Sequence, residues 1–302
     1  MTHRFASHAL YLGLLGFLEV GSRVPPRLTR SLGRGLGQAA FRLSSKYRNR
    51  IRAHLEIAFP ELDPSDRDAI TADSARHFGT MLAEIAWLWR ASPQDVESMC
   101  AIDGAEHLVT ALEQGRGAMM ITAHCGNWEL LSARISVAGI PLSAPVRQMD
   151  EPRLDRLVTS MRTRFGTEIC PRGPDVGRRL IRALHNNRVV GLLIDQDIGD
   201  IPGVFVPFFG RPAWTPTGAA MLALRRRCPV IPAFIHRCPD GTHRLEIQPP
   251  LPTPTAGSPE LQIKELTAAA TWSIEQQVRA HPEQWVWTHR RWRTVPPPTG
   301  SK

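Results

Sequence analysis

The segment ITAHCGNWELL, residues 121–131, places a histidine directly after an apolar run and a glutamate five residues later. An imidazole titrates near neutral pH, so His124 is predicted to act as a general base. Glu129 is expected in the first turn of the following helix, where it can accept a hydrogen bond from one imidazole nitrogen and leave the other basic. Spacing alone also allows two metal ligands or a purely structural His–Glu pair.

Other chemistries at this segment are less favoured. A metal site needs a third ligand, and no second cluster of His, Asp or Glu at ligand spacing supplies one. Cys125 adjoins His124, but neighbouring side chains at a strand end point to opposite faces, which argues against a Cys–His nucleophile. The sequence contains no G-x-S-x-G, no P-loop and no H-E-x-x-H motif, so serine hydrolase, NTPase and zincin chemistries are not predicted.

Polar residues also follow two other predicted strands. One of these strands stops at Arg147, and another stops at Asp195, Gln196 and Asp197. In open α/β sheets, reactive groups gather beyond the carboxyl ends of the strands. These side chains are therefore expected to converge on His124.

The elements that must position these residues alternate along the chain. Apolar runs of strand length are expected at 118–123, 141–149, 188–194 and 228–237, with 242–248 pairing beside the last as a hairpin. Helices are expected at 38–60, 66–91, 104–117, 128–139, 151–166, 174–187, 215–227 and 260–280. This alternation predicts an α/β fold with a largely parallel central sheet flanked by helices.

The N-terminal segment, residues 1–37, is predicted to associate with a membrane. Its apolar stretch at 9–20 is interrupted by Glu19 and is shorter than a confident membrane span. A basic region follows, with no acidic residue between Glu19 and Glu56, and basic residues favour an anionic lipid surface. Residues 38–302 are expected to form a single α/β domain, and whether the N-terminal segment spans or lies on the membrane stays open.

Charge and cysteine content restrict the class of protein. The 302 residues carry a formal net charge of +9, which favours anionic partners. A non-catalytic protein that binds a membrane surface or nucleic acid is one reading of this charge, but no nucleic-acid-binding motif is present. The five cysteines form no C-x-x-C pair, which is typical of reduced thiols rather than a disulfide framework or zinc ribbon.

Several segments, in this order, resemble the lipid A biosynthesis late acyltransferases of the lauroyl/myristoyl type, a branch of the H-x-x-x-x-D/E acyltransferases. The similar segments are RNRIRAHLEIAFPEL (48–62), GRGAMMITAHCGNWELL (115–131), EPRLDRLVTSMRTRFG (151–166), GLLIDQDIGDIPGVFVPFFGRPAWTPTG (191–218), ALRRRCPVIPAFIHR (223–237) and PEQWVWTHRRWR (282–293). They are distributed along most of the chain, from residue 48 to residue 293. An ordered set of this kind is far more specific than the histidine motif alone.

The resemblance implies roles for particular residues. His124 would be the base and Glu129 its orienting partner, and either Arg162 or Arg164 would match the arginine of the family. The residues expected to bind substrate are Arg147, Arg162, Arg164, Asp195, Gln196, Asp197 and Arg211. Residues 203–210 are a candidate wall of a groove for the acyl chain.

The resemblance also implies the reaction. A substrate hydroxyl, deprotonated by His124, would attack the thioester of acyl carrier protein directly, and the acceptor would be a phosphorylated glucosamine lipid. No cofactor is expected beyond acyl-acyl carrier protein as co-substrate. The expected partners are acyl carrier protein, the glycolipid and an anionic membrane surface, without nucleic acid, at the cytoplasmic face of a bacterial inner membrane. An alternative is an acyltransferase acting on a different glycolipid or on a glycerophospholipid, with acyl-CoA as a possible donor.

Overall fold

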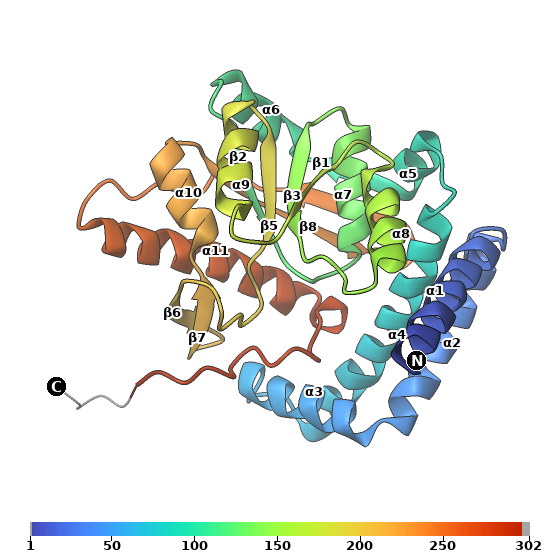
Figure 1. The fold of residues 1–302 in the computed structure, drawn as a ribbon. Helices are drawn as coiled ribbons and strands as arrows, with labels where there is room; N and C mark the ends of the chain where they lie inside the picture. Colours follow the sequence, from blue (N-terminus) through green and yellow to red (C-terminus); the bar gives the residue numbers. More distant parts are fainter. Residues whose placement is uncertain (1, 298–302) are drawn as a thin grey trace.

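The computed structural model describes residues 2–297, with side chains from residue 8 onward (Figure 1). Within that range, a seven-stranded sheet has the order β1-β9-β8-β2-β5-β3-β4. Its strands are β1 (Cys100–Asp103), β2 (Ala118–Thr122), β3 (Leu142–Val146), β4 (Glu168–Pro171), β5 (Val189–Leu193), β8 (Val230–Arg237) and β9 (His243–Ile247). Strands β8, β2, β5, β3 and β4 run parallel, while β9 is antiparallel to β8 and carries β1 beside it. The predicted α/β fold with a largely parallel sheet is confirmed.

Helices cover both faces of the sheet. Those that follow the N-terminal region are α5 (Pro93–Met99), α6 (Ala105–Glu113), α7 (Trp128–Val137), α8 (Pro152–Thr163), α9 (Val176–His185), α10 (Gly218–Arg226) and α11 (Pro259–Ala280). The buried side chains of α9, α10 and α11 pack in one cluster, and those of α5, α6 and α7 pack in another. The sheet is therefore the middle of three layers.

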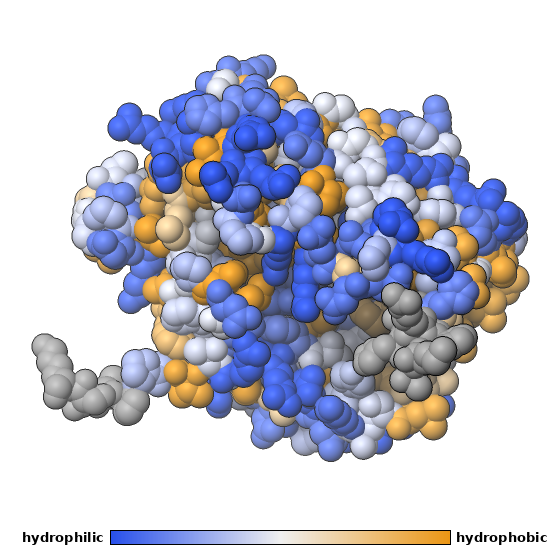
Figure 2. Space-filling view, viewed as in Figure 1, coloured by the Kyte–Doolittle hydropathy of each residue, from blue (hydrophilic) through white to orange (hydrophobic). Residues whose placement is uncertain are grey.

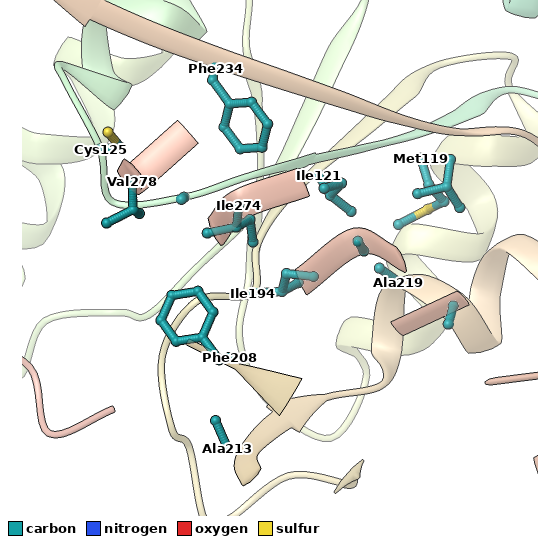
Figure 3. Packing of buried hydrophobic residues seen from close by; sticks show 14 of the residues in the cluster. Met119, Ile121, Cys125, Ile194, Phe208, Ala213, Ala219, Phe234, Ile274 and Val278 are labelled. Atoms are coloured by element: carbon teal, nitrogen blue, oxygen red, sulfur yellow. The ribbon is translucent and has the colours of Figure 1, made fainter. Parts of the chain in front are cut away.

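The alternation of side chains along β2 explains these layers. Met119 and Ile121 belong to the cluster with α11, where Figure 3 shows them near Ile274 and Ala219. Met120 points into the opposite cluster, because successive side chains of a strand project to opposite faces. All five residues of β2 are buried, and the first four are apolar, as expected for a strand that is covered on both faces.

The N-terminal region consists of four helices: α1 (Thr2–Gly21), α2 (Pro26–Leu43), α3 (Ser45–Ala58) and α4 (Pro64–Leu88). The backbones of α2 and α4 come very close at three glycines: a Cβ atom on Gly79 would lie 2.1 Å from the carbonyl oxygen of Gly33, and one on Gly37 would lie 2.9 Å from the Cα of Gly79. Among residues 2–297, no helix combines the length and hydrophobicity that crossing a membrane requires.

The structure differs from the predicted secondary structure in two respects. The helix expected at 38–60 is divided, because Ser44 leaves the helical region (φ −110°, ψ 89°) and separates α2 from α3. Serine favours such boundaries, since its hydroxyl competes with helical hydrogen bonding. The short elements β1, β4 and α5 and the hairpin of β6 (Gly203–Phe208) and β7 (Arg211–Pro216) were not predicted.

Candidate active site

His124 and Asp195 meet at the carboxyl edge of the sheet. Strands β2 and β5 are parallel neighbours in which Thr122 is opposite Leu193, so the residues just beyond both strands lie side by side. Nδ1 of His124 lies 2.8 Å from Oδ1 of Asp195. The backbone N–H of His124 donates to Oδ2 of the same carboxylate, also at 2.8 Å. Asp195 therefore holds both the ring and the main chain of the histidine.

The Asp195 carboxylate is buried and ionised. It is 2% exposed, and the indole Nε1–H of Trp285 donates to its Oδ2 at 2.8 Å. Burial alone would raise the pKa of Asp195, but the charge and hydrogen bonds of His124, together with the Trp285 bond, lower it below its usual value. An ionised carboxylate can only accept, so Nδ1 of His124 carries a hydrogen, and in the neutral form of the ring Nε2 keeps its lone pair.

Glu129 does not take the predicted position against His124. It lies in the first turn of α7, where it is 8% exposed, and pairs instead with Arg162 at the end of α8. Nε of Arg162 donates to both carboxylate oxygens, at 2.9 and 3.1 Å, and Nη2 donates to Oε1 as well. The expected hydrogen bond between Glu129 and the imidazole is therefore wrong: Asp195 takes that position because β5, not α7, brings a carboxylate to Nδ1.

The remaining predicted arginines lie apart from this pair. Arg164 is exposed and donates to the carbonyl of Trp89, so of the two arginines in the RTR segment only Arg162 contacts Glu129. Arg147 is exposed just after β3, and Arg211 is exposed at the start of β7. Neither side chain forms a hydrogen bond or ion pair with another residue in the described part of the chain.

Asp197 anchors the C-terminal segment rather than facing His124. It is 2% exposed and accepts hydrogen bonds from the backbone N–H and the hydroxyl of Thr294, at 2.7 and 2.9 Å. Its own N–H donates to Nε2 of His289 at 2.9 Å. Gln196, between the two aspartates, is partly exposed. The structure thus joins Asp195 to His124, whereas Asp197 binds the chain that crosses the site.

An apolar groove of about 740 Å³ begins beside this site. Trp128 and Trp285 are among its lining residues, and the Trp128 and His124 rings make an edge-to-face contact with ring centres 5.0 Å apart. The walls come mainly from α1, α2, α3, α4 and residues 285–288. Residues 203–210 do not line it: they form β6 and its turn, and Figure 3 shows Phe208 pointing into the core. The groove suits a long apolar ligand.

The alternative chemistries find no support in this geometry. Burial raises the pKa of the Cys125 thiol, so it stays protonated and is a poor nucleophile. Among the described residues, no three His, Cys, Asp or Glu side chains are grouped so as to hold a metal ion.

Sequence reasoning missed Trp128 and Trp285 as parts of the site, and it gave Asp195 a different role. Trp285 stands in PEQWVWT, a segment used only as a mark of family resemblance. The backbone N–H of Val286 donates to the carbonyl of His124 at 3.1 Å, so this distant segment lies directly against the histidine. For Asp195, the signal in the sequence was its position at the end of a predicted strand. That position predicted that Asp195 lies near His124, but not that it binds the imidazole.

Comparisons with known proteins identify the family to which this chain is similar. The model of a family described as "Bacterial lipid A biosynthesis acyltransferase" matches residues 3–294. The chain is 30% identical to the lipid A biosynthesis lauroyltransferase of Escherichia coli (strain K12), over 95% of this chain and 92% of that protein. It is 28% identical to the palmitoleoyltransferase of the same organism, over 93% and 90%. It is also 28% identical to a phosphatidylinositol mannoside acyltransferase of Mycobacterium tuberculosis (strain CDC 1551 / Oshkosh), over 63% and 59%.

Proposed function

Because the chain belongs to the bacterial lipid A biosynthesis acyltransferases, we propose that it moves a fatty acyl group from acyl carrier protein to a hydroxyl of a phosphorylated glucosamine lipid. The observation that carries this proposal is the position of His124, whose Nδ1 is bound to Asp195 and whose ring packs on Trp128, a residue that lines the apolar groove. A base and a binding site for an acyl chain therefore lie together.

In the proposed reaction, Nε2 of His124 removes the proton from the acceptor hydroxyl as its oxygen attacks the thioester carbonyl. Collapse of the tetrahedral intermediate breaks the C–S bond and releases the thiolate of the carrier, which takes up the proton from His124. Asp195 stabilises the imidazolium formed between these steps. No enzyme nucleophile is needed, which is consistent with the buried, protonated Cys125.

The basic surface supports an acidic protein donor. Arg178, Arg179 and Arg182 are exposed on α9, and Figure 2 shows hydrophilic side chains gathered over this helix. We propose that these arginines, with Arg147, contact acyl carrier protein or the phosphates of the acceptor, since guanidinium groups bind phosphate and carboxylate groups with several hydrogen bonds.

The face formed by α1 and α2 supports attachment to a membrane surface. Leu10, Leu12 and Leu28 are 52–60% exposed there, and Figure 2 shows hydrophobic residues along this edge. Exposed arginines, including Arg27 and Arg34, lie on α2 among the leucines. Such a mixture is typical of a helix that lies in a lipid interface, and we propose the cytoplasmic face of the inner membrane as its location.

The decisive experiment is acyl transfer by the purified chain, with products identified by mass spectrometry. Lauroyl-acyl carrier protein and a tetraacylated, phosphorylated glucosamine disaccharide are the test substrates, and His124→Ala is expected to lower kcat by about 10²–10⁴-fold. A fully active His124→Ala variant would overturn the mechanism.

A second acceptor is favoured by the similarity to the phosphatidylinositol mannoside acyltransferase. The assay is therefore repeated with phosphatidylinositol mannoside as the acceptor. It is also repeated with lauroyl-CoA, the alternative donor. Faster transfer to the mannoside, or from the CoA thioester, would replace the proposed acceptor or donor.

A further inference from the structure

A buried polar network lies behind the turn that follows His124. Glu84 of α4 is 3% exposed, and Arg237, the last residue of β8, donates to its two carboxylate oxygens from Nε and Nη2 at 2.8 and 2.6 Å. The two residues are 153 positions apart in the chain. The proposed reaction uses neither of them.

The network contacts the turn at two points. Nδ2 of Asn127 donates to Oε2 of Glu84 at 3.1 Å. Nε2 of His77 lies 3.2 Å from the carbonyl oxygen of Gly126. Both contacted residues belong to the short connection between β2 and α7, so the network holds this connection from the side of α4 and β8.

Arg237 determines which nitrogen of His77 carries the hydrogen. Its Nη1 donates to Nδ1 of His77 at 2.6 Å, and a guanidinium has no acceptor. Nδ1 must therefore accept, which leaves Nε2–H to donate to Gly126. Burial and the charge of Arg237 lower the pKa of His77 to about 3, so the ring is neutral at physiological pH.

The backbone conformation of the turn is also restricted by its immediate surroundings. Gly126 has a φ of +60°, and a Cβ atom there would lie 2.0 Å from the carbonyl oxygen of Ile235. Oδ1 of Asn127 accepts from the backbone N–H of Leu130 at 3.1 Å and so caps α7. The residue that Glu84 holds is thus also the residue that starts the helix carrying Glu129.

We propose that Glu84, Arg237 and His77 are positioning residues for acyl transfer. They hold the Gly126–Asn127 turn, and through it they set the position of His124 relative to the first turn of α7. The inference rests on His124 being the base of the proposed function. A charge pair buried this deeply adds little net stability, because desolvation offsets the attraction between the charges.

The test compares two substitutions at one position. His77→Gln keeps an amide N–H near Nε2 that can donate to Gly126 and an oxygen that can accept from Arg237, whereas His77→Phe keeps neither. We expect His77→Phe to lower kcat by about 10–100-fold, the size of effect that a small misplacement of reacting groups produces. His77→Gln should recover most of the lost kcat.

Arg188→Met is the matched control. Arg188 also pairs with a glutamate, Glu168, at 2.9 Å, and donates to Ser143 at 2.7 Å. It lies just before the amino-terminal end of β5, whereas His124 follows the carboxyl end of β2. This variant should lower Tm without lowering kcat. Glu84→Gln should lower both, because it leaves Arg237 without its charged partner.

Hydrogen–deuterium exchange measures, without any substrate, how firmly the network holds the turn after His124. Peptides covering residues 121–131 should exchange faster in His77→Phe and Glu84→Gln than in the wild type, and at the wild-type rate in Arg188→Met. Equal kcat in His77→Phe and His77→Gln, together with unchanged exchange in this segment, would overturn the inference. A wild type that transfers no acyl group would contradict the proposed function instead, and the exchange comparison would then decide the positioning role alone.

Discussion

His124 and Asp195 lie 71 residues apart in the chain, yet the aspartate accepts hydrogen bonds from both the ring and the backbone of the histidine at 2.8 Å. This double contact restrains the rotation of the imidazole as well as its tautomer. Trp285 completes the carboxylate environment by donating to the oxygen that also holds the backbone. The orientation of the proposed base is therefore decided by a strand neighbour and by the C-terminal segment.

Asp195→Asn should lower kcat by about 10³-fold, because an amide can present its N–H₂ to Nδ1 and favour the wrong tautomer. The measurement is steady-state acyl transfer at saturating donor. Asp103→Asn is the control, since Asp103 forms an exposed ion pair with Arg244 far from the histidine. Unchanged kcat in Asp195→Asn would show that the carboxylate does not orient the base.

Glu129 and Arg162 should behave as one unit. Removing either partner leaves a largely buried charge unpaired, so Glu129→Ala and Arg162→Ala should each lower kcat/KM by about 10–100-fold. The double variant should be no worse than the poorer single variant. Losses that multiply in the double variant would mean that the two residues act independently.

The groove should limit the length of the acyl chain that the protein accepts. Ala40 lines the groove on α2, and its neighbour Ala39 does not, although both are exposed. Ala40→Phe should therefore lower kcat/KM about tenfold or more for the longest acyl donors and much less for short ones, whereas Ala39→Phe should change neither. The comparison uses a series of acyl-acyl carrier proteins of increasing chain length. An equal loss of kcat/KM at every chain length would show that the groove does not bind the acyl chain.

The face of α1 and α2 should bind anionic lipid. Leu10→Asp combined with Leu12→Asp should weaken sedimentation with phosphatidylglycerol-containing vesicles by about tenfold, because both leucines are exposed on α1. Leu261→Asp, at an exposed leucine of α11, is the control and should bind as the wild type does. Binding of the wild type should weaken as salt concentration rises. If the double variant binds vesicles as the wild type does, the protein contacts the lipid through another face.

Stability should decrease as the pH falls below 6.5. Burial lowers the pKa of His54, His77 and His289, so each takes up a proton in the unfolded chain before it does so in the folded protein. Stability from these groups is complete above pH 6.5 and is lost as pH falls below it. For His77, with a pKa of about 3, the loss between pH 7.5 and 5.0 is up to about 2 kcal/mol.

Urea denaturation at those two pH values measures this loss. The difference in the free energy of unfolding should be smaller in His77→Gln than in the wild type by that amount. An identical difference in both proteins would mean that His77 is not held neutral by the fold.

Periodicity and strand length predicted most of the larger elements, because each buries a regular apolar face. The helices α4, α7 and α11 and the strands β2, β5 and β8 lie close to their expected bounds. The elements β1, β4 and α5 were missed, because they are too short to show a period and lack the continuous apolar run that marks β2 and β5. Ser44 divided one expected helix, since a single residue outside the helical region leaves the apolar pattern on either side unchanged.

The residues that make up the site were partly evident from the sequence as well. Position at strand ends singled out His124 and Asp195, and the same rule placed Asp197 beside them. The rule does not specify which side chains meet, so Glu129 was expected at the imidazole although it pairs with Arg162. The groove was expected from residues 203–210, but the N-terminal helices form it together with the segment around Trp285.

The sequence by itself determined the family, the class of fold and the histidine proposed as base, because these depend on local patterns and on ordered motifs. Only the tertiary structure decided that Asp195 orients His124, that Glu129 binds Arg162, and that an apolar groove begins at Trp128. These relationships join β2 to β5, α7 to α8, and α2 and α4 to the C-terminal segment. The physical reason is that a hydrogen bond depends on the distance between two atoms in space, and spacing along the chain specifies that distance only within a single element.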